Sequence, residues 1–135
     1  MTTSDRFKVG DQASITKTIT DTHIRAFAEL SGDQNPVHLD DAFASQTPFK
    51  RRIAHGMLTA SLISSVIANK LPGGGSIYLG QTLKFVSPVY PGDTVTAVVT
   101  VLSIRSDKPI MKLETVCTNQ HSKTVLEGEA TVLLV

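Results

Sequence analysis

The sequence lacks several features that mark common classes of protein. Its single cysteine, Cys117, cannot form a disulfide within the chain. The 13 basic and 12 acidic residues give a formal net charge of +1, so no electrostatic excess points to nucleic acid as a partner. The four histidines are scattered, and no Cys/His cluster has the spacing of zinc ligands. The sequence therefore predicts no disulfide, no nucleic-acid partner and no metal site.

Long apolar runs are also missing. No run approaches the ~20 residues that a helix needs to cross a bilayer. The segment Met1 to Arg6 does not have the charged-then-apolar pattern of a signal peptide. With 41% hydrophobic and 19% charged residues the composition is globular, and 135 residues suffice for one domain with a buried core. We expect residues 1–135 to form a single soluble, cytoplasmic domain with no membrane partner.

The longest helical pattern begins near His55 and Gly56 and ends near Asn69 and Lys70. Apolar residues occupy nearly every face of this helix, with only small hydroxyl residues between them. The Leu-Pro-Gly-Gly-Gly segment at 71–75 ends the helix. Because a helix that is apolar all round should be buried, the rest of the chain is expected to cover it.

After residue 76 the chain alternates apolar and polar residues, as strands do. Leu113 and Cys117 fall on one face of such a strand, which predicts a buried structural thiol rather than a nucleophile. Together with an early strand between residues 7 and 19, the pattern predicts an α+β fold. An antiparallel sheet of about five strands curls around the long helix and covers most of its sides. The Thr- and Val-rich strands are expected to pair across a dimer, since an exposed edge would be hazardous. The long strands are expected at residues 94–104, 110–118 and 124–135.

Polar chemistry is concentrated in the segment 27–38. Gly32 suits a helix C-cap because it tolerates positive φ, and the proline after Asn35 keeps that residue out of helical geometry. Asp33 and His38 are a candidate acid/base pair, since a carboxylate and an imidazole can together hold and deprotonate a water. A local role is the alternative, in which Asp33 caps backbone amides and His38 packs in the loop.

The start of the long helix is a second candidate site. Its first amides have no intrahelical acceptor and the helix dipole is positive there, so the Gly56 amide can bind a substrate oxygen. Alternatively, the glycine only relieves crowding. His55 is either a ligand or a structural hydrogen-bonding group. Ser64 lies eight residues beyond Gly56 on roughly the same face, where its hydroxyl orients a carboxylate or bonds back to its own helix.

The basic run Lys50, Arg51 and Arg52 also has two interpretations. It is a solvated loop, or it contacts the phosphate groups of a substrate carrier. No Gly-x-Ser-x-Gly nucleophile elbow and no Gly-x-x-x-x-Gly-Lys phosphate loop occurs in the sequence.

The segment 27–44 resembles the hydratase-2 signature of the MaoC-like (R)-specific enoyl-CoA hydratases. The matching elements are Ser31-Gly32-Asp33, Asn35-Pro36-Val37-His38 and the small residue Ala44. The resemblance extends over almost the whole chain. It includes the segments Ile53–Leu58, Gly75–Gly80 and Pro91–Asp93, and also Phe85.

This resemblance implies a hot-dog fold and a homodimer with active sites near the interface. It implies that Asp33 and His38 are the catalytic dyad and that Asn35 supports it. The Gly56 amide corresponds to the donor to the thioester carbonyl, and Ser64 to a serine that bonds the catalytic aspartate. No metal or redox cofactor is implied, because the CoA thioester is the substrate.

The implied reaction is the reversible hydration of trans-2-enoyl-CoA to (R)-3-hydroxyacyl-CoA, linking β-oxidation to polyhydroxyalkanoate precursors. Short-to-medium acyl chains are expected, although the sequence does not fix their length. Three alternatives stay open: an acyl-CoA thioesterase, a non-catalytic acyl-binding module, and a dehydratase that acts on carrier-protein-bound or specialised thioesters.

Overall fold

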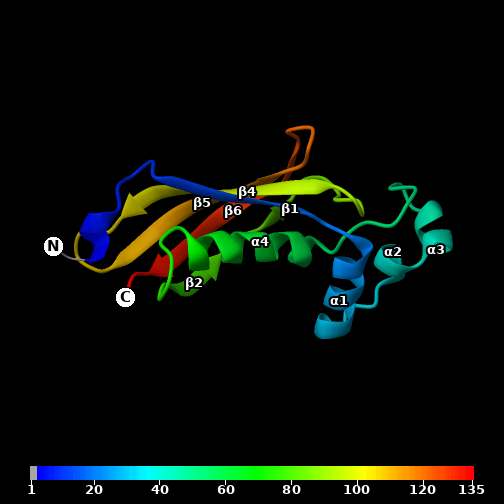
Figure 1. The fold of residues 1–135 in the computed structure, drawn as a ribbon, viewed down its shortest axis with the longest axis horizontal. Coiled ribbons are helices and arrows are strands. Elements are labelled where there is room, and N and C mark those ends of the chain that lie inside the picture. The colour runs from blue at the N-terminus through cyan, green and yellow to red at the C-terminus, as the bar shows by residue number, and fades with distance from the viewer. Residues whose placement is uncertain (1–2) are drawn as a thin grey trace.

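A long helix lies along one face of a twisted antiparallel sheet, and three shorter helices gather beyond one end of it (Figure 1). The structure is a computed structural model that describes residues 3–135. The helices are a short 3₁₀ turn η1 (Thr3–Arg6), α1 (Asp21–Ser31), α2 (Pro36–Leu39), α3 (Asp41–Ser45) and α4 (Gly56–Asn69). The strands are β1 (Gln12–Thr18), β2 (Ile77–Gln81), β3 (Lys84–Phe85), β4 (Thr94–Ile104), β5 (Ile110–Thr118) and β6 (Thr124–Leu133).

The sheet has the strand order β1-β4-β5-β6-β2, and β3 also pairs with β6. The three longest strands form an antiparallel meander in which Ala97 pairs with Cys117 and Cys117 with Leu126. The sequence predicts about five strands, and the sheet has six. The additional strand is the two-residue β3, which pairs with β6 separately from β2, whose own register shifts between Tyr78 and Gly80. The α+β class and the antiparallel sheet are confirmed.

The core lies between the sheet and α4. Alternate residues of β4 are fully or almost fully buried, and so is the matching face of β5. Burying one such side chain contributes about 1.5–3 kcal/mol to folding. Cys117 is fully buried in this layer, and burial raises the pKa of its thiol to about 12, so the predicted structural role is confirmed. The core side chains contributed by α4 are Leu62, Ile63, Val66 and Ile67.

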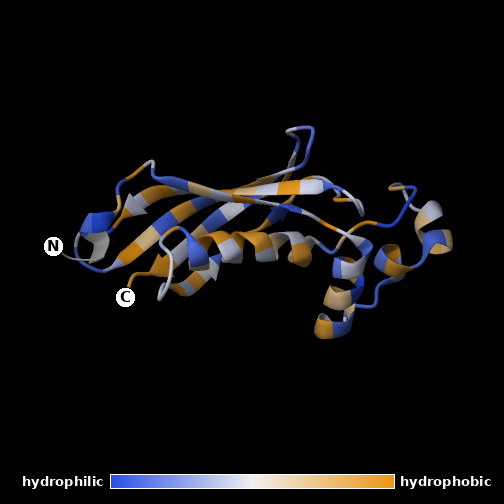
Figure 2. Cartoon of the chain, viewed as in Figure 1, coloured by the Kyte–Doolittle hydropathy of each residue, from blue (hydrophilic) through white to orange (hydrophobic). Residues whose placement is uncertain are grey.

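The sheet packs along α4 as predicted and leaves one side of the helix uncovered. Ser61 and Ser64 are exposed on the uncovered side, and Met57 is 55% exposed. Figure 2 shows α4 as mostly apolar or intermediate in hydropathy along its length. An apolar helix with one uncovered side is therefore available for contact with another surface.

The free edges of the sheet are β1 and β2. The Val-rich strand β4 does not offer the edge predicted to pair across a dimer, because it lies between β1 and β5. Strand β2 instead presents three consecutive exposed apolar side chains, Ile77, Tyr78 and Leu79. Within residues 3–135, no helix is both long and apolar enough to cross a membrane.

Candidate active site

Helix α1 ends where the polar loop begins. Thr20 caps the start of α1 by accepting a hydrogen bond from the His23 amide, and Gly32 ends it with φ 79° in the left-handed region. Asn35 has φ −54° and ψ 125°, and its Oδ1 accepts from the Val37 amide at 3.2 Å. The predicted cap and break are confirmed. The one-turn helix α2 was not predicted, because Pro36 acts as its first residue rather than only as a breaker.

Asp33 lies on this loop and is exposed. Its Oδ1 accepts a hydrogen bond from the Asn35 amide at 3.2 Å, so the local capping role predicted as the alternative is present. Its Oδ2 has no hydrogen bond to any residue in the described part of the chain. One carboxylate oxygen thus anchors the loop and the other remains available to a ligand. Asn35 supports this arrangement through its backbone amide and its cap on α2.

His38 is 8% exposed, and its Nδ1 lies 2.8 Å from the Ile53 carbonyl oxygen. Because a carbonyl only accepts, Nδ1 carries the proton and Nε2 keeps a lone pair. Burial lowers the pKa of His38 below its usual 6.5, and the neighbouring His55 acts in the same direction. The bond to Ile53 and the Asp33 carboxylate oppose these effects without overcoming them. His38 is therefore a neutral imidazole with a free acceptor near pH 7.

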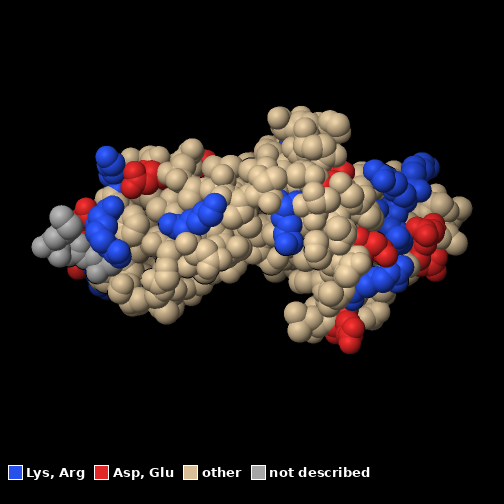
Figure 3. Space-filling model, viewed as in Figure 1, with Lys and Arg blue, Asp and Glu red and all other residues tan. Residues whose placement is uncertain are grey.

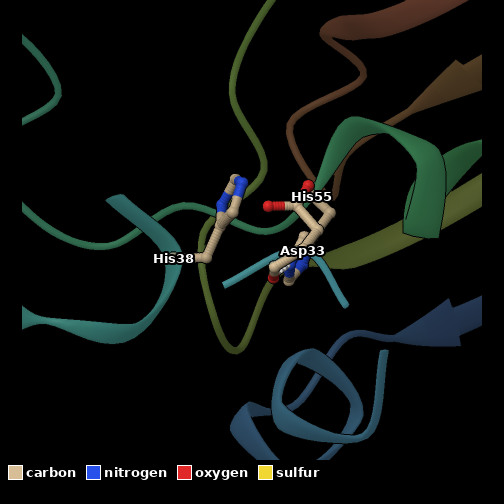
Figure 4. Close-up of side chains that lie close together, drawn as sticks. All are labelled: Asp33, His38 and His55. Carbon is tan, nitrogen blue, oxygen red and sulfur yellow. Dashed lines mark hydrogen bonds between the residues drawn. The ribbon is translucent and has the colours of Figure 1, made fainter. Parts of the chain in front are cut away.

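His55 connects the two halves of the dyad. It is 2% exposed, and its Nε2 donates to the Asp33 backbone carbonyl at 3.1 Å. Its ring stacks on His38 with centroids 3.9 Å apart, and Phe27 packs against it at 4.9 Å. Figure 4 shows these three side chains together: Asp33 comes from the segment between α1 and α2, His38 from α2, and His55 from the position immediately before α4. The structure thus favours a structural hydrogen-bonding role for His55 over a ligand role.

Gly56 is the first residue of α4, and its amide donates to no acceptor in residues 3–135. The Phe85 ring lies directly against it: a Cβ on Gly56 would be 2.5 Å from a ring carbon. Glycine is therefore required here while Phe85 keeps its position. The amide stays unpaired at the positive end of the helix dipole, as expected of an oxyanion donor.

These groups meet at a cavity of about 360 Å³. Its polar end contains Asp33, His38 and His55, and most of its remaining lining is apolar. This combination suits an apolar chain attached to a polar reacting group. The remaining lining residues are Phe49, Ile53, Ala54, Gly56, Met57, Thr59, Phe85, Val86, Ser87, Pro88, Val89, Val125 and Leu126.

Ser64 does not reach this site within one chain. It is exposed, and its hydroxyl makes no hydrogen bond within the described residues. Eight residues separate it from Gly56, which is ~12 Å along a helix. The structure therefore brings Asp33, His38 and Gly56 together and leaves Ser64 apart from them.

The basic run divides into two kinds of residue. Arg52 donates to the Asp21 and Asp41 carboxylates at 2.5 and 2.7 Å and to the His38 carbonyl at 3.3 Å, and Arg52 lowers the pKa of Asp21. Arg52 thus ties the loop to α1 and α3, which does not favour the predicted phosphate contact for it. Lys50 and Arg51 are exposed, and Arg51 stacks over Tyr90. Figure 3 shows that basic and acidic side chains are mixed at the end of the molecule containing α1 to α3.

Asp33, His38 and His55 offer atoms within 4.8 Å of one another, a spacing that invites comparison with a metal site. The two imidazoles are stacked with only 29° between their planes. Their in-plane lone pairs therefore lie in two stacked, nearly parallel planes, which is unfavourable for both rings to bind one ion. The arrangement suits a small polar ligand such as water better than a metal ion.

The sequence did not single out two residues that the structure places in the site. Thr59 is 2% exposed in the cavity lining, although on the sequence it is one of several hydroxyl residues of the long helix. Phe85 was noted only for its resemblance to the family's sheet, and the structure places its ring against Gly56. The spacing of three residues between Gly56 and Thr59 is the one signal that could have identified Thr59.

Comparison with known proteins identifies the family. A model of the MaoC like domain matches residues 8–124. An (R)-specific enoyl-CoA hydratase of Rhodospirillum rubrum is 50% identical over 94% of this chain and 88% of its own length. The protein of the same name from Aeromonas caviae is also 50% identical, over 94% of this chain and 95% of its own.

The fold comparison agrees. A solved structure described as an (R)-hydratase from A. caviae involved in PHA biosynthesis matches this chain with a TM-score of 0.95 and 48% identity. The match covers 98% of this chain and 100% of that one. The chain belongs to the MaoC-like domain family, and its sheet and long helix form the hot-dog fold.

Proposed function

We propose that this protein is an (R)-specific enoyl-CoA hydratase, a lyase that adds water reversibly to trans-2-enoyl-CoA to form (R)-3-hydroxyacyl-CoA. The observation that carries the proposal is the meeting of three groups at one apolar cavity: the free Asp33 oxygen, neutral His38 and the unpaired Gly56 amide. The 50% identity to each of the two (R)-specific enoyl-CoA hydratases described above also supports this reaction. Supply of polyhydroxyalkanoate precursors is the corresponding metabolic role, in line with the solved A. caviae relative.

The mechanism assigns one role to each group. A water lies between Asp33 Oδ2 and His38 Nε2, both of which can accept its protons. The Gly56 amide donates to the thioester oxygen, which makes C3 of the enoyl group electrophilic. Water adds at C3 as the dyad removes a proton, and the dyad returns a proton to C2. His38 has to be neutral to begin this cycle, and its burial favours that form.

No metal or redox cofactor takes part in this proposal, because the oxyanion donor and the proton acceptor are both protein groups. We also propose that residues 1–135 act as one catalytic domain in the cytoplasm. The phosphates of CoA are expected to contact Lys50 and Arg51, which are exposed and follow Phe49 at the cavity wall.

A homodimer would complete the site. The exposed apolar edge β2 and the uncovered side of α4 are the surfaces that a second copy would bury. Because Ser64 is ~12 Å along the helix from Gly56, we propose that it reaches Asp33 of the other copy. Mixed dimers of Asp33→Asn chains and Ser64→Ala chains would then contain one intact site. Equal activity of the mixture and of the two separate variants would contradict this arrangement.

The function is tested with crotonyl-CoA. The expected result is loss of enoyl absorbance and formation of (R)-3-hydroxybutyryl-CoA, identified by chiral analysis, with no release of free CoA thiol. Thiol release at a comparable rate would favour the thioesterase, and saturable binding without water addition would favour the acyl-binding module. Faster turnover of the matching acyl-carrier-protein thioester would favour the carrier-protein dehydratase. A series of enoyl chain lengths then defines the acyl preference.

A further inference from the structure

The cavity that contains the dyad has a buried part and an exposed mouth. The buried part is lined by side chains that are at most 5% exposed, among them Val89, Val125 and Leu126. The mouth is formed by four exposed lining side chains: Phe49, Met57, Phe85 and Val86. An apolar acyl chain fits the buried part, so the polar carrier of a thioester substrate has to leave through the mouth.

Phe49 is the mouth residue that precedes two positive charges. It is 37% exposed, and the exposed residues Lys50 and Arg51 follow it. The Arg51 guanidinium makes no hydrogen bond or ion pair within residues 3–135. An exposed ring beside unpaired guanidinium donors suits a carrier that has an arm with apolar groups and ends in phosphates, as CoA does.

Tyr90 contacts the residues on both sides of Lys50. Its hydroxyl donates to the Phe49 backbone carbonyl at 3.2 Å, and the Arg51 guanidinium lies over its ring, 4.0 Å from the centroid. Lys50 has φ 68°, in the left-handed region that a residue with a side chain seldom adopts. Such a conformation persists only where the surrounding structure holds it. Tyr90 provides one holding contact on each side of this residue.

Tyr90 is itself fixed by groups outside the cavity. Its amide donates to Asp93 Oδ2 at 2.9 Å, and the Asp93 amide donates to the Tyr90 carbonyl at 2.9 Å. Asp93 is 8% exposed, and its Oδ1 accepts from Gln120 Nε2 at 2.9 Å. A buried carboxylate that accepts on both oxygens is well anchored. The Tyr90 side chain therefore connects the firmly held turn before β4 to the segment 49–51.

We propose that Tyr90 is a positioning residue for the thioester carrier: its hydroxyl holds Phe49 against the carrier arm, and its ring holds Arg51 toward the carrier phosphates. Tyr90 acts through these two residues and does not contact the reacting atoms. It therefore affects how tightly the carrier binds and not how fast water adds. This inference rests on the proposed function for the identity of the substrate.

The test uses three crotonyl thioesters that shorten the carrier stepwise. Crotonyl-CoA has the arm and the phosphates, crotonyl-pantetheine has the arm alone, and the N-acetylcysteamine thioester has only the first part of the arm. The variants are Tyr90→Phe, which removes the hydroxyl and keeps the ring, and Arg51→Gln, which removes the charge. Arg105→Gln is the matched control, because Arg105 is exposed and pairs with Asp107 instead of lining the cavity.

In Tyr90→Phe we expect KM to rise about two- to tenfold for crotonyl-CoA and crotonyl-pantetheine, the loss expected for one neutral hydrogen bond. The KM for the N-acetylcysteamine thioester and kcat should stay unchanged, because the dyad and the buried part are intact. In Arg51→Gln we expect KM to rise about tenfold for crotonyl-CoA alone, because only CoA has the phosphates. Arg105→Gln should keep all three KM values. If Tyr90→Phe does not fold, Phe49→Ala carries the same expectation.

An unchanged KM for crotonyl-CoA in Tyr90→Phe would overturn the inference. An equal rise in KM for the N-acetylcysteamine thioester would also overturn it, because the effect would then not depend on the carrier. The Kd for free CoA, measured by calorimetry, tests the same contacts without turnover and should rise by the same factor. Wild-type protein that binds CoA without hydrating crotonyl-CoA would overturn the proposed function, and the change in Kd would still decide the inference.

Discussion

The sheet and the catalytic loop are built in different ways. In β4 and β5, alternate side chains are buried and the backbone is paired along nearly the whole strand. The segment between Gly32 and Gly56 has little regular structure and is held by a few polar contacts: Asn35 to Asp33, His38 to Ile53, and His55 to Asp33. Stability should therefore depend mainly on the sheet, and activity mainly on a small number of hydrogen bonds.

Substitutions in the Asp33–His38 dyad are expected to affect activity far more than stability. Asp33→Asn and His38→Ala should each reduce crotonyl-CoA hydration by about 10²–10⁴-fold, because each removes a group that binds or accepts a proton from the water. The free energy of urea unfolding should change little for Asp33→Asn, since the asparagine can still accept from the Asn35 amide. Near-normal turnover in either variant would contradict the assignment of the dyad.

The converse is expected in the sheet. Leu113→Ala removes a fully buried side chain that does not line the cavity and should lower the free energy of unfolding by about 2–5 kcal/mol. Turnover per folded molecule should stay at the wild-type level, measured well below the unfolding midpoint. A lower kcat in fully folded Leu113→Ala protein would mean that the sheet also affects the geometry of the active site.

Gly56→Ala tests the junction of the two regions. The added Cβ would lie 2.5 Å from the Phe85 ring, so the ring or the helix start has to move, and we expect a loss of about 10²-fold in kcat/KM. Combining it with Phe85→Leu should recover part of the activity if the ring is the obstacle. Full activity of Gly56→Ala alone would show that this contact does not position the substrate.

A smaller effect is expected at Arg52, which joins Asp21, Asp41 and the His38 carbonyl. Arg52→Gln should cost about 1 kcal/mol of stability, because both carboxylates are solvent-exposed and water screens the ion pairs. It should also lower kcat a few-fold through looser placement of His38. If Arg52→Gln showed this loss of stability with no change in kcat, the role of Arg52 would be limited to stabilising the fold.

The pH profile gives the mildest test. Burial holds the folded-state pKa of His38 below its usual 6.5, so the acid-side midpoint of the kcat/KM profile should lie below pH 6.5. The unfolded chain binds the proton more readily, so this residue's contribution to stability is full above about pH 6.5 and is lost as pH falls through the folded-state value. An inflection in kcat/KM above pH 6.5 that disappears in His38→Gln would contradict this assignment.

The sequence predicts an element accurately where its pattern of apolar and polar residues continues over many positions. The bounds of β4 and β5 match the prediction because alternation continues for nine residues or more, and α4 matches because of its strong stop at Leu71–Gly75. Short elements such as α2 and β3 contain too few residues to establish a period. The polar loop was found because a proline-stiffened segment held Asp33, Asn35 and His38 together.

The remaining features depend on distances that a sequence does not encode locally. Arg52 was grouped with Lys50 and Arg51 because the three are adjacent, yet its partners Asp21 and Asp41 lie 31 and 11 residues away. Ser64 was placed near Asp33 by family resemblance, but helix geometry separates them within one chain.

The pairing of β1 with β4 joins residues that are 76 to 88 positions apart, such as Thr18 with Thr94 and Gln12 with Thr100. The chain between these strands contains Asp33, His38, Gly56 and Phe85, whereas β4, β5 and β6 pair through short connections. Closing a loop of this length costs more entropy and is slower than forming the meander. During refolding, the three-stranded meander is therefore expected to form first, and enzymatic activity to return last.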